Sequence, residues 1–511
     1  MIELLSKGRL TKLLHILLPY EPMLRRSILL IVMFAIPLAV SINATSSKFD
    51  PDGWWHLRTG QWIVENRMVP LTDSFSIMDG TRWIAYSWAY ELVLYGLYSA
   101  FGLSGFVIYG IVMSLTITFA LYSLLRAISG RIVLTVALTS AGILALLPML
   151  HIRSFMFSIS FLILEMWVLY RVKATSNVRL LPLLPLLFVL WANIHIQFVF
   201  GLFVYVMMSL EIISDALRSG TLQRQNQKKR LILWLVGVGL TSGLATLATP
   251  YHFHIYLHLF DIVRQPEFYK YISELQSPRF RSIDTWAILF ITLSAAFAIG
   301  WRKNIRPFTL ILFGVATIIG FRSHRDAWFT AIIGVAILTH SLAGQGEAEE
   351  SGHSKSLVFI CLAVIILLSW FYRGVTNENL IERVSRQYPA AAAEFVVKQG
   401  YPGPVYNHFN WGGYLIWKLP QRLVSMDGRG YLYGSKRFVR GARTWLAKPD
   451  WQDDQDLKAA RTIIASPKWG LTAVLRLHPR FQMVYEDSIS VVFVAVASDE
   501  TFANSREDEL Q

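Results

Sequence analysis

The feature that most limits how this chain can fold is a series of long apolar segments. Several of them reach about 17 residues or more, which exceeds what a helix in a soluble core needs and matches the thickness of a bilayer. Only 16% of the residues are charged, whereas a soluble protein has about a quarter. The sequence therefore predicts a polytopic α-helical membrane protein with about eleven transmembrane helices. The predicted spans are 27–44, 105–125, 132–150, 155–171, 180–196, 198–216, 231–249, 285–301, 307–320, 327–343 and 356–372.

The basic residues predict how the chain is oriented. With residues 1–26 in the cytoplasm, the basic loops "RVKATSNVR" and "RSGTLQRQNQKKR" also face the cytoplasm, as the positive-inside rule requires. The net charge of +14 is then loop charge, and no basic cluster is interleaved with a soluble fold that would bind nucleic acid. The single cysteine, Cys361, excludes an intramolecular disulfide and a multi-cysteine metal site. We expect a multi-pass protein of the cell (inner or plasma) membrane.

The polar loops and the tail are expected on the opposite, extracytoplasmic side. A transmembrane domain at 27–372 would contain a first outer loop at 45–104, whose segment 84–101 has the aromatic pattern of an interfacial helix. In the tail, 373–511, short apolar runs such as "RTIIAS" and "SVVFVAV" alternate with helical patterns. This alternation predicts a C-terminal extracytoplasmic α/β domain.

The stretch "DPDGWWHLRT" at 50–59 begins the first outer loop. Asp50, Pro51 and Asp52 have the chemistry of a helix start, with an acidic cap, a proline in the first turn and a carboxylate near the positive end of the dipole. Two carboxylates are present where one cap suffices, which favours a catalytic role for one of them. From sequence, either Asp50 or Asp52 could be the cap. The neighbouring Trp54, Trp55, His56 and Arg58 are expected either to line a substrate cleft or to anchor the loop at the membrane surface.

A second group of polar residues is cationic. Arg322, His324 and Arg325 lie in "FRSHRD" between two spans, on the side where positive charge is normally depleted. Arginine binds phosphate through two parallel hydrogen bonds, so this group predicts an anion site, with Arg153 of "HIRS" as a further candidate cation. The alternative is that Asp326 pairs with Arg322 and the other side chains reach the interface.

Other polar residues on this side give weaker signals. Asn193, His195 and Gln197 in "NIHIQ" are expected to line a polar cleft. A metal-binding histidine set in "YHFHIYLH" is disfavoured, because histidines two residues apart lie on different sides of a helix. Asp50, Asp52 and His56 could hold a divalent cation such as Mg²⁺ or Mn²⁺ but form an incomplete ligand shell, so the metal requirement stays open.

Extracytoplasmic chemistry must use a donor that has already crossed the membrane. A polyprenyl-phosphate-linked sugar fits, with one carboxylate as the base for the acceptor hydroxyl and cations for the departing phosphate. "DPDGWWHLRT" and the residues that follow it resemble the first outer loop of a bacterial group within the GT-C superfamily of membrane glycosyltransferases, which begins D-x-D-x-W-W-H. "VYNHFNWGGYLIWKL" and "LVSMDGRGYLYG" are similar to the C-terminal region of the same group. The resemblance implies a catalytic acidic residue in this loop, at Asp50 or Asp52.

The chain departs from that group where a His-Glu-Trp-like element is expected, because it has Tyr86, Ser87 and Trp88 there. In the tail, Asp427 and Arg429 either form a plain strand-ending turn or contact the acceptor, which is a glycan, lipid or protein. Two other classes of protein remain as alternatives. One is a transporter or flippase of lipid-linked intermediates, and the other is a non-catalytic membrane assembly protein.

Overall fold

The structure is a computed structural model that describes residues 21–47, 49–218, 225–301, 306–343 and 375–496. It is mostly helical, with one small sheet, and the chain divides into two compact units. Unit 1 comprises Met1–Ala44, Val107–Thr249 and Glu274–Thr376, and unit 2 comprises Thr45–Phe106, Pro250–Ser273 and Asn377–Gln511. This division differs from the predicted one, because the first outer loop groups with the C-terminal region and not with the predicted membrane domain.

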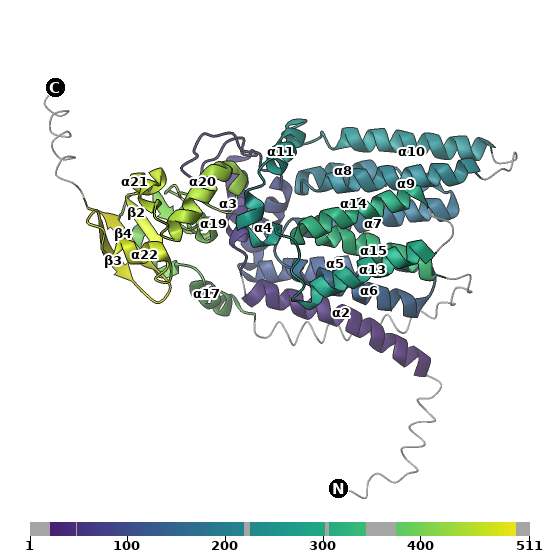
Figure 1. The fold of residues 1–511 in the computed structure, drawn as a ribbon, viewed down its shortest axis with the longest axis horizontal. Helices are drawn as coiled ribbons and strands as arrows, with labels where there is room; N and C mark the ends of the chain where they lie inside the picture. Colours follow the sequence, from purple (N-terminus) through teal and green to yellow (C-terminus); the bar gives the residue numbers. More distant parts are fainter. Residues whose placement is uncertain (1–20, 48, 219–224, 302–305, 344–374, 497–511) are drawn as a thin grey trace, which may run out of the picture. The chain divides into compact units, whose positions relative to one another are not determined.

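Unit 1 is built from long apolar helices that run alongside one another (Figure 1). Each predicted span within the described residues contains an α-helix, and six of these spans coincide with helices long and apolar enough to cross a membrane. The predicted span 356–372 lies outside the described residues. The elements are α2 (Glu21–Ser47), α5 (Ser104–Ser129), α6 (Ile132–Leu146), η2 (Leu147–Met149), α7 (Phe155–Thr175), η3 (Val178–Leu180), α8 (Leu183–Ile194), α9 (Phe198–Arg218), α10 (Gln225–Ala245), α13 (Ile283–Trp301), α14 (Pro307–Arg322), η6 (His324–Asp326) and α15 (Ala327–Leu342).

Among the described residues, six helices are long and apolar enough to cross a membrane, which makes the chain a helical membrane protein. The six segments are Ile28–Ser47, Ser104–Ser129, Ile132–Met149, Phe155–Thr175, Phe198–Arg218 and Ile283–Trp301, and shorter apolar helices cover Val178–Ile194, His254–Val263 and Pro307–Arg322. Helix α15 is buried at every residue from Ala327 to Thr339, because it packs against α6, α13 and α14. The central helix of unit 1 therefore faces protein on all sides.

Unit 2 combines a helical half with an α/β half. Its elements are α3 (Pro51–Asn66), α4 (Trp88–Phe101), α11 (His254–Val263), α12 (Phe268–Tyr271), η5 (Ser273–Leu275) at its border, α17 (Asn377–Ser385), α18 (Ala390–Lys398), β1 (Val405–Asn407), α19 (Phe409–Lys418), α20 (Gly430–Trp445), η7 (Trp451–Asp453), α21 (Gln455–Ala459), β2 (Thr462–Ala465), α22 (Gly470–Leu475), β3 (Phe481–Glu486) and β4 (Val491–Ala495).

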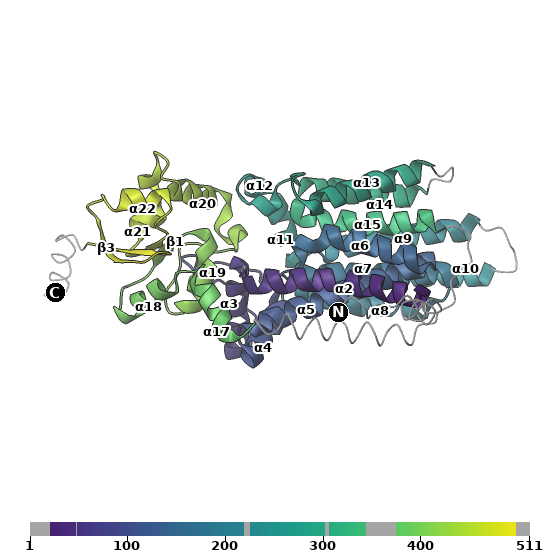
Figure 2. The ribbon, with the colours of Figure 1, turned by 90° about the horizontal axis from the view of Figure 1, so that it is seen from below.

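The sheet of unit 2 has the strand order β1-β2-β4-β3, with β1 and β2 parallel and the other pairs antiparallel. Helices α21 and α22 lie on one side of it and α18 on the other (Figure 2). The predicted runs "GPVYN", "RTIIAS", "FQMVYED" and "SVVFVAV" each contain a strand. The predicted strand in "RLVSM" is wrong, because Val424 forms only isolated bridges, to Ser76 and Val405.

Glycines let the two halves of unit 2 approach closely. A Cβ atom on Gly413 of α19 would lie 2.6 Å from the carbonyl oxygen of Pro51 in α3, and one on Gly412 would lie 1.9 Å from that of Met426. A Cβ atom on Gly60 of α3 would lie 2.2 Å from the carbonyl oxygen of Glu91 in α4. Helix α3 is therefore held between α4 and α19 by backbone contacts that no side chain would permit.

Candidate functional site

The start of α3 separates the roles of the two candidate aspartates. Asp50 has extended backbone angles, and its Oδ1 accepts a hydrogen bond of 2.9 Å from the backbone N–H of Asp52. Pro51 is the first helical residue, where its missing N–H costs nothing. Asp50 is therefore the helix cap, and Asp52 is a half-buried carboxylate in the first turn.

Asp52 lies against the glycine turn of the C-terminal region. A Cβ atom on Gly428 would fall 1.8 Å from Oδ1 of Asp52 and 2.8 Å from Nε1 of Trp55, so only glycine fits there. The indole N–H of Trp55 is buried and has no hydrogen-bond partner among the described residues. "DPDGWW" and "SMDGRG", which are far apart in the sequence, thus form one local environment around this carboxylate.

Two of the side chains expected to line a cleft beside Asp52, Trp54 and Trp55, serve packing. Trp54 is 3% exposed and packs among the rings of Phe49, Phe106, Tyr388 and Tyr414, with centroid distances between 5.1 and 6.1 Å. This placement contradicts both the cleft-lining and the membrane-anchor interpretations of Trp54.

Trp55 is likewise buried, and its ring edge meets Trp83 at 6.4 Å. Arg58 binds along its own helix, to Gln61 at 2.9 Å and Glu65 at 3.4 Å. Trp55 therefore lacks the exposure that a cleft-lining residue needs. One terminal nitrogen of the Arg58 guanidinium is bound to side chains of α3.

His56 has a partner that sequence reasoning missed. Its Nδ1 lies 3.0 Å from Oε1 of Glu91 on α4, and both side chains are buried. Burial raises the pKa of Glu91 well above its usual range, and the nearby charge of Arg429 lowers it only in part. The neutral carboxyl form of Glu91 is therefore favoured beside the imidazole of His56. The available signal was a lone glutamate in the aromatic helix "WAYELVL".

The raised pKa of Glu91 predicts a pH dependence of stability. The free carboxyl titrates near 4.5, so above that pH the folded chain holds a proton that the unfolded chain has released, and the free energy of unfolding falls as pH rises toward the folded pKa. Glu91→Gln should remove this slope. Its thermal midpoint relative to wild type should rise between about pH 5 and pH 8. Parallel midpoints for the two proteins across this range would contradict a raised pKa.

Asp427 and Arg429 form an internal ion network. Both are 0% exposed. The guanidinium of Arg429 donates to Oδ1 and Oδ2 of Asp427 at 2.8 and 2.6 Å, and to Oδ1 of Asp73 at 2.6 Å. The guanidinium also lies 4.5 Å from the ring of Trp83. The polar atoms of both residues are used within unit 2, and their contact with an acceptor stays a prediction.

In unit 1, two of the four predicted phosphate-binding residues converge. Arg153, which precedes α7, lies 3.6 Å from Glu274, and Arg325 of η6 lies 3.8 Å from the same carboxylate. These distances belong to loose ion pairs between partly exposed groups. The structure thus brings together two arginines that are 172 positions apart in the sequence, with one carboxylate between them.

Two more predicted residues adjoin this arginine pair. Burial lowers the pKa of His195 well below its usual range, and the charges of Arg325 and Arg153 lower it further. His195 Nδ1 lies 2.8 Å from the hydroxyl of Ser158. Gln197 donates to Asp326 at 2.6 Å, and burial raises the pKa of Asp326 while Arg325 opposes that rise. His195 is therefore a neutral group beside the two cations.

The remaining members of the predicted set are held elsewhere. His324 Nε2 contacts Asp284 Oδ2 at 3.1 Å. Asn193 donates to the carbonyl oxygens of Val189 and Ala248 at 2.8 and 2.9 Å, which fixes the end of α8. Arg322 ends α14. The predicted pairing of Asp326 with Arg322 is replaced by the bond from Gln197.

Within the described ranges, no group of three or more His, Cys, Asp or Glu side chains is placed to hold a metal ion. His56 of the proposed Asp50–Asp52–His56 set is directed to Glu91. His254 begins α11 and contacts the carbonyl oxygen of Tyr251 at 3.2 Å. Among the described residues, the Mg²⁺ or Mn²⁺ considered from sequence therefore finds no set of three such ligands.

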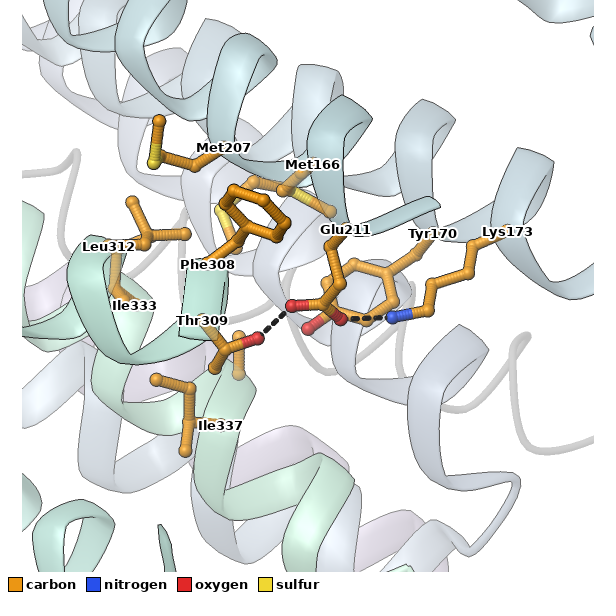
Figure 3. Close-up of a pocket in the computed structure, with 12 residues that line it drawn as sticks. Met166, Tyr170, Lys173, Met207, Glu211, Phe308, Thr309, Leu312, Ile333 and Ile337 are labelled. Atoms are coloured by element: carbon orange, nitrogen blue, oxygen red, sulfur yellow. Dashed lines mark hydrogen bonds and ion pairs between the residues drawn. The ribbon is translucent and has the colours of Figure 1, made fainter. Parts of the chain in front are cut away.

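A small pocket in unit 1 surrounds a buried charge cluster (Figure 3). Glu211 of α9 accepts hydrogen bonds from Lys173 and Thr309. Arg306 lies 2.9 Å from Glu211 and 3.2 Å from Asp215. Because cations and a hydroxyl surround the carboxylate, it joins α7, α9 and the start of α14, and the cavity of about 30 Å³ holds little more than water.

The fold defines the class of this chain as a helical membrane protein with a small α/β region. No family model matches it. No curated protein sequence matches it significantly.

Proposed function

We propose that the chain is a membrane glycosyltransferase that moves a sugar from a polyprenyl-phosphate donor to an extracytoplasmic acceptor. The observation that carries this proposal is that Asp50 and Asp52 have different roles at the start of α3. Asp50 caps the helix, so the second carboxylate, Asp52, is not needed for capping. The basic loops support the orientation with the N-terminus in the cytoplasm and the C-terminal region outside.

In the proposed reaction, the carboxylate of Asp52 accepts the proton of an acceptor hydroxyl. The hydroxyl oxygen forms a bond to the anomeric carbon, and the bond from that carbon to the phosphate oxygen breaks. Polyprenyl phosphate leaves with the electron pair, and the anomeric configuration inverts. The acceptor proton ends on Asp52, so the step is balanced without a further reactant.

The phosphate of the donor is assigned to Arg153 and Arg325. Both arginines already share one carboxylate, Glu274, and a phosphate offers the same acceptor chemistry with more oxygens and charge. His195, neutral beside them, can add a hydrogen bond without adding charge.

Arg325→Ala is therefore expected to weaken donor binding by about tenfold or more, since a charge-assisted hydrogen bond contributes roughly 1.5–3 kcal/mol. The measurement is native mass spectrometry of the protein in nanodiscs with short-chain polyprenyl-phosphate sugars. The control is Arg281→Ala, an exposed arginine of the same unit with no ion pair among the described residues. Equal donor binding by both variants would remove the phosphate assignment.

One observation favours the transporter alternative. Glu165 lies within the apolar helix α7, is 0% exposed, and neither of its carboxylate oxygens has a hydrogen-bond partner in the described part of the chain. A Cβ atom on Gly201 would lie 2.8 Å from Oε2 of this residue. Ionisable residues inside spans often mark transport paths. Movement of lipid-linked sugars across proteoliposomes that Glu165→Gln abolishes, with no sugar transfer by the wild type, would favour the transporter.

A further inference from the structure

A second pocket lies entirely within unit 2. Three segments form it: Arg82–Ile84 of the first outer loop, α11 with the residues just after it, and Tyr431–Leu432 at the start of α20. Its volume is about 520 Å³, within the range of roughly 300–1,000 Å³ typical of small-molecule sites. All three segments belong to the same compact unit.

The charged residues of this pocket favour an anion. Arg82 and Arg264 are both exposed at its lining, and neither forms an ion pair within the described ranges. Asp261 is the one carboxylate among the lining residues. Two guanidinium groups against one carboxylate leave a net positive charge, and arginine pairs well with carboxylate or phosphate groups.

Two polar atoms at the wall of the pocket have unused hydrogen-bonding capacity. His258 Nε2 and Gln265 Oε1 are buried and have no partner among the described residues. Burial lowers the pKa of His258 to about 4, although the charge of Asp261 opposes this shift. The imidazole is therefore neutral at pH 7 and can exchange a hydrogen bond with a hydroxyl. A buried polar atom without a partner is unfavourable, and a ligand with hydroxyl groups would supply the missing hydrogen bonds.

Rings and an apolar side chain complete the wall. The ring of His258 meets that of Tyr431 edge-on at 4.7 Å, and the indole N–H of Trp83 donates to the hydroxyl of Tyr431 at 2.9 Å. Leu257 adds an exposed apolar surface. Hydroxyl partners beside an apolar surface suit a sugar ring, which has polar edges and a face of C–H groups.

We propose that this pocket binds a saccharide that carries an acidic group. Arg82 and Arg264 hold the acid, and His258 and Gln265 bond hydroxyl groups. Tyr431 is three residues from Gly428, the glycine that lies against Asp52, and Trp83 contacts Trp55. If the proposed function holds, on which this last step rests, the occupant is the sugar acceptor.

The test is a calorimetric titration of the full-length protein in phosphatidylcholine nanodiscs. Glucuronic acid tests a carboxylate as the acidic group, and glucose 6-phosphate tests a phosphate. Glucose is the control for the sugar without an acid, and inorganic phosphate is the control for the acid without a sugar. At least one acidic sugar should bind about tenfold more tightly than glucose and than inorganic phosphate. The proposal would be overturned if neither acidic sugar bound more tightly than both glucose and inorganic phosphate.

Substitutions inside and outside the pocket test whether the acidic sugar binds there. Arg264→Ala should weaken the acidic sugar about tenfold, whereas Arg461→Ala, an exposed arginine of the same unit, should not. Gln265→Ala should weaken the acidic sugar and leave inorganic phosphate unchanged, which keeps the test sharp if His258→Phe does not fold. Unchanged affinity in both Arg264→Ala and Gln265→Ala would place any binding outside this pocket.

The binding test and the transfer test can fail separately. Asp52→Asn should bind the acidic sugar like wild type, because binding needs no base. Sugar binding in the pocket together with full transfer by Asp52→Asn would refute the role of Asp52 and leave the pocket proposal standing. Loss of transfer in Asp52→Asn with no sugar binding by the wild type would do the opposite.

Discussion

Asp52→Asn is expected to lower sugar transfer by about 10²–10⁴-fold, the usual contribution of a general base, while Asp50→Asn retains most of the activity. The reason is geometric. Asn caps helices as well as Asp does, so the bond from Asp50 to the backbone N–H of Asp52 has an equivalent in that variant. The measurement is transfer from a polyprenyl-phosphate sugar, with circular dichroism to confirm folding. Equal losses in the two variants would refute the assignment of Asp52 as the base.

A pair of glycine variants tests the same site without touching its carboxylates. In Gly428→Ala the new methyl group would fall 1.8 Å from Oδ1 of Asp52, so the carboxylate must move, and a displacement of about 1 Å can cost about 10²-fold in rate. In Gly53→Ala the methyl group meets no atom within 4 Å and lies in a helix, where alanine is favoured over glycine. Wild-type transfer by Gly428→Ala would show that the position of Asp52 does not matter.

Arg429→Met is expected to destabilise unit 2 by about 3–5 kcal/mol, because removing one partner from a buried ion network leaves the others buried and charged. Asp427 and Asp73 are both 0% exposed and would lose their shared cation. The measurement is the midpoint of thermal unfolding of the full-length protein, followed by tryptophan fluorescence, since Trp83 lies on the guanidinium of Arg429.

Two comparisons make this prediction specific. Arg443→Ala removes an exposed pair with Asp450 and should leave the midpoint unchanged, because exposed ion pairs contribute little. Adding Asp73→Asn and Asp427→Asn to Arg429→Met should recover part of the lost stability, since no unpaired charge then remains. A small loss in Arg429→Met would show that water reaches the network.

The membrane helices and most strands of the tail could be predicted because they depend on local patterns. Long apolar runs, and short apolar runs that alternate with helical patterns, can be recognised at any position of a sequence. The role of Asp50 could not be predicted, because Asp50 and Asp52 are equally good caps by composition. Only the backbone angles at Asp50 decide between them. Sequence proximity also placed His324 beside Arg325, whereas the structure pairs His324 with Asp284.

The pairs that build the candidate sites are distant in sequence. Glu91 pairs with His56, Asp73 with Arg429, and Glu274 with Arg153. No single residue of such a pair is unusual enough to identify its partner, since a glutamate or aspartate near a span is ordinary in isolation. A lone carboxylate in an otherwise apolar helix, as at Glu91, is the signal with the most value for such cases.

The composition of unit 2 has a consequence for the order in which the protein can mature. Its three parts are Thr45–Phe106, Pro250–Ser273 and Asn377–Gln511, so the first part is synthesised more than 320 residues before Arg429. Until then Asp73 lacks its cation, and α3 lacks the glycine face of α19. The loop around Asp52 therefore stays incompletely folded until the C-terminal region has been translated. A chain truncated before Arg429 would keep the predicted membrane helices and lose the environment of the proposed base.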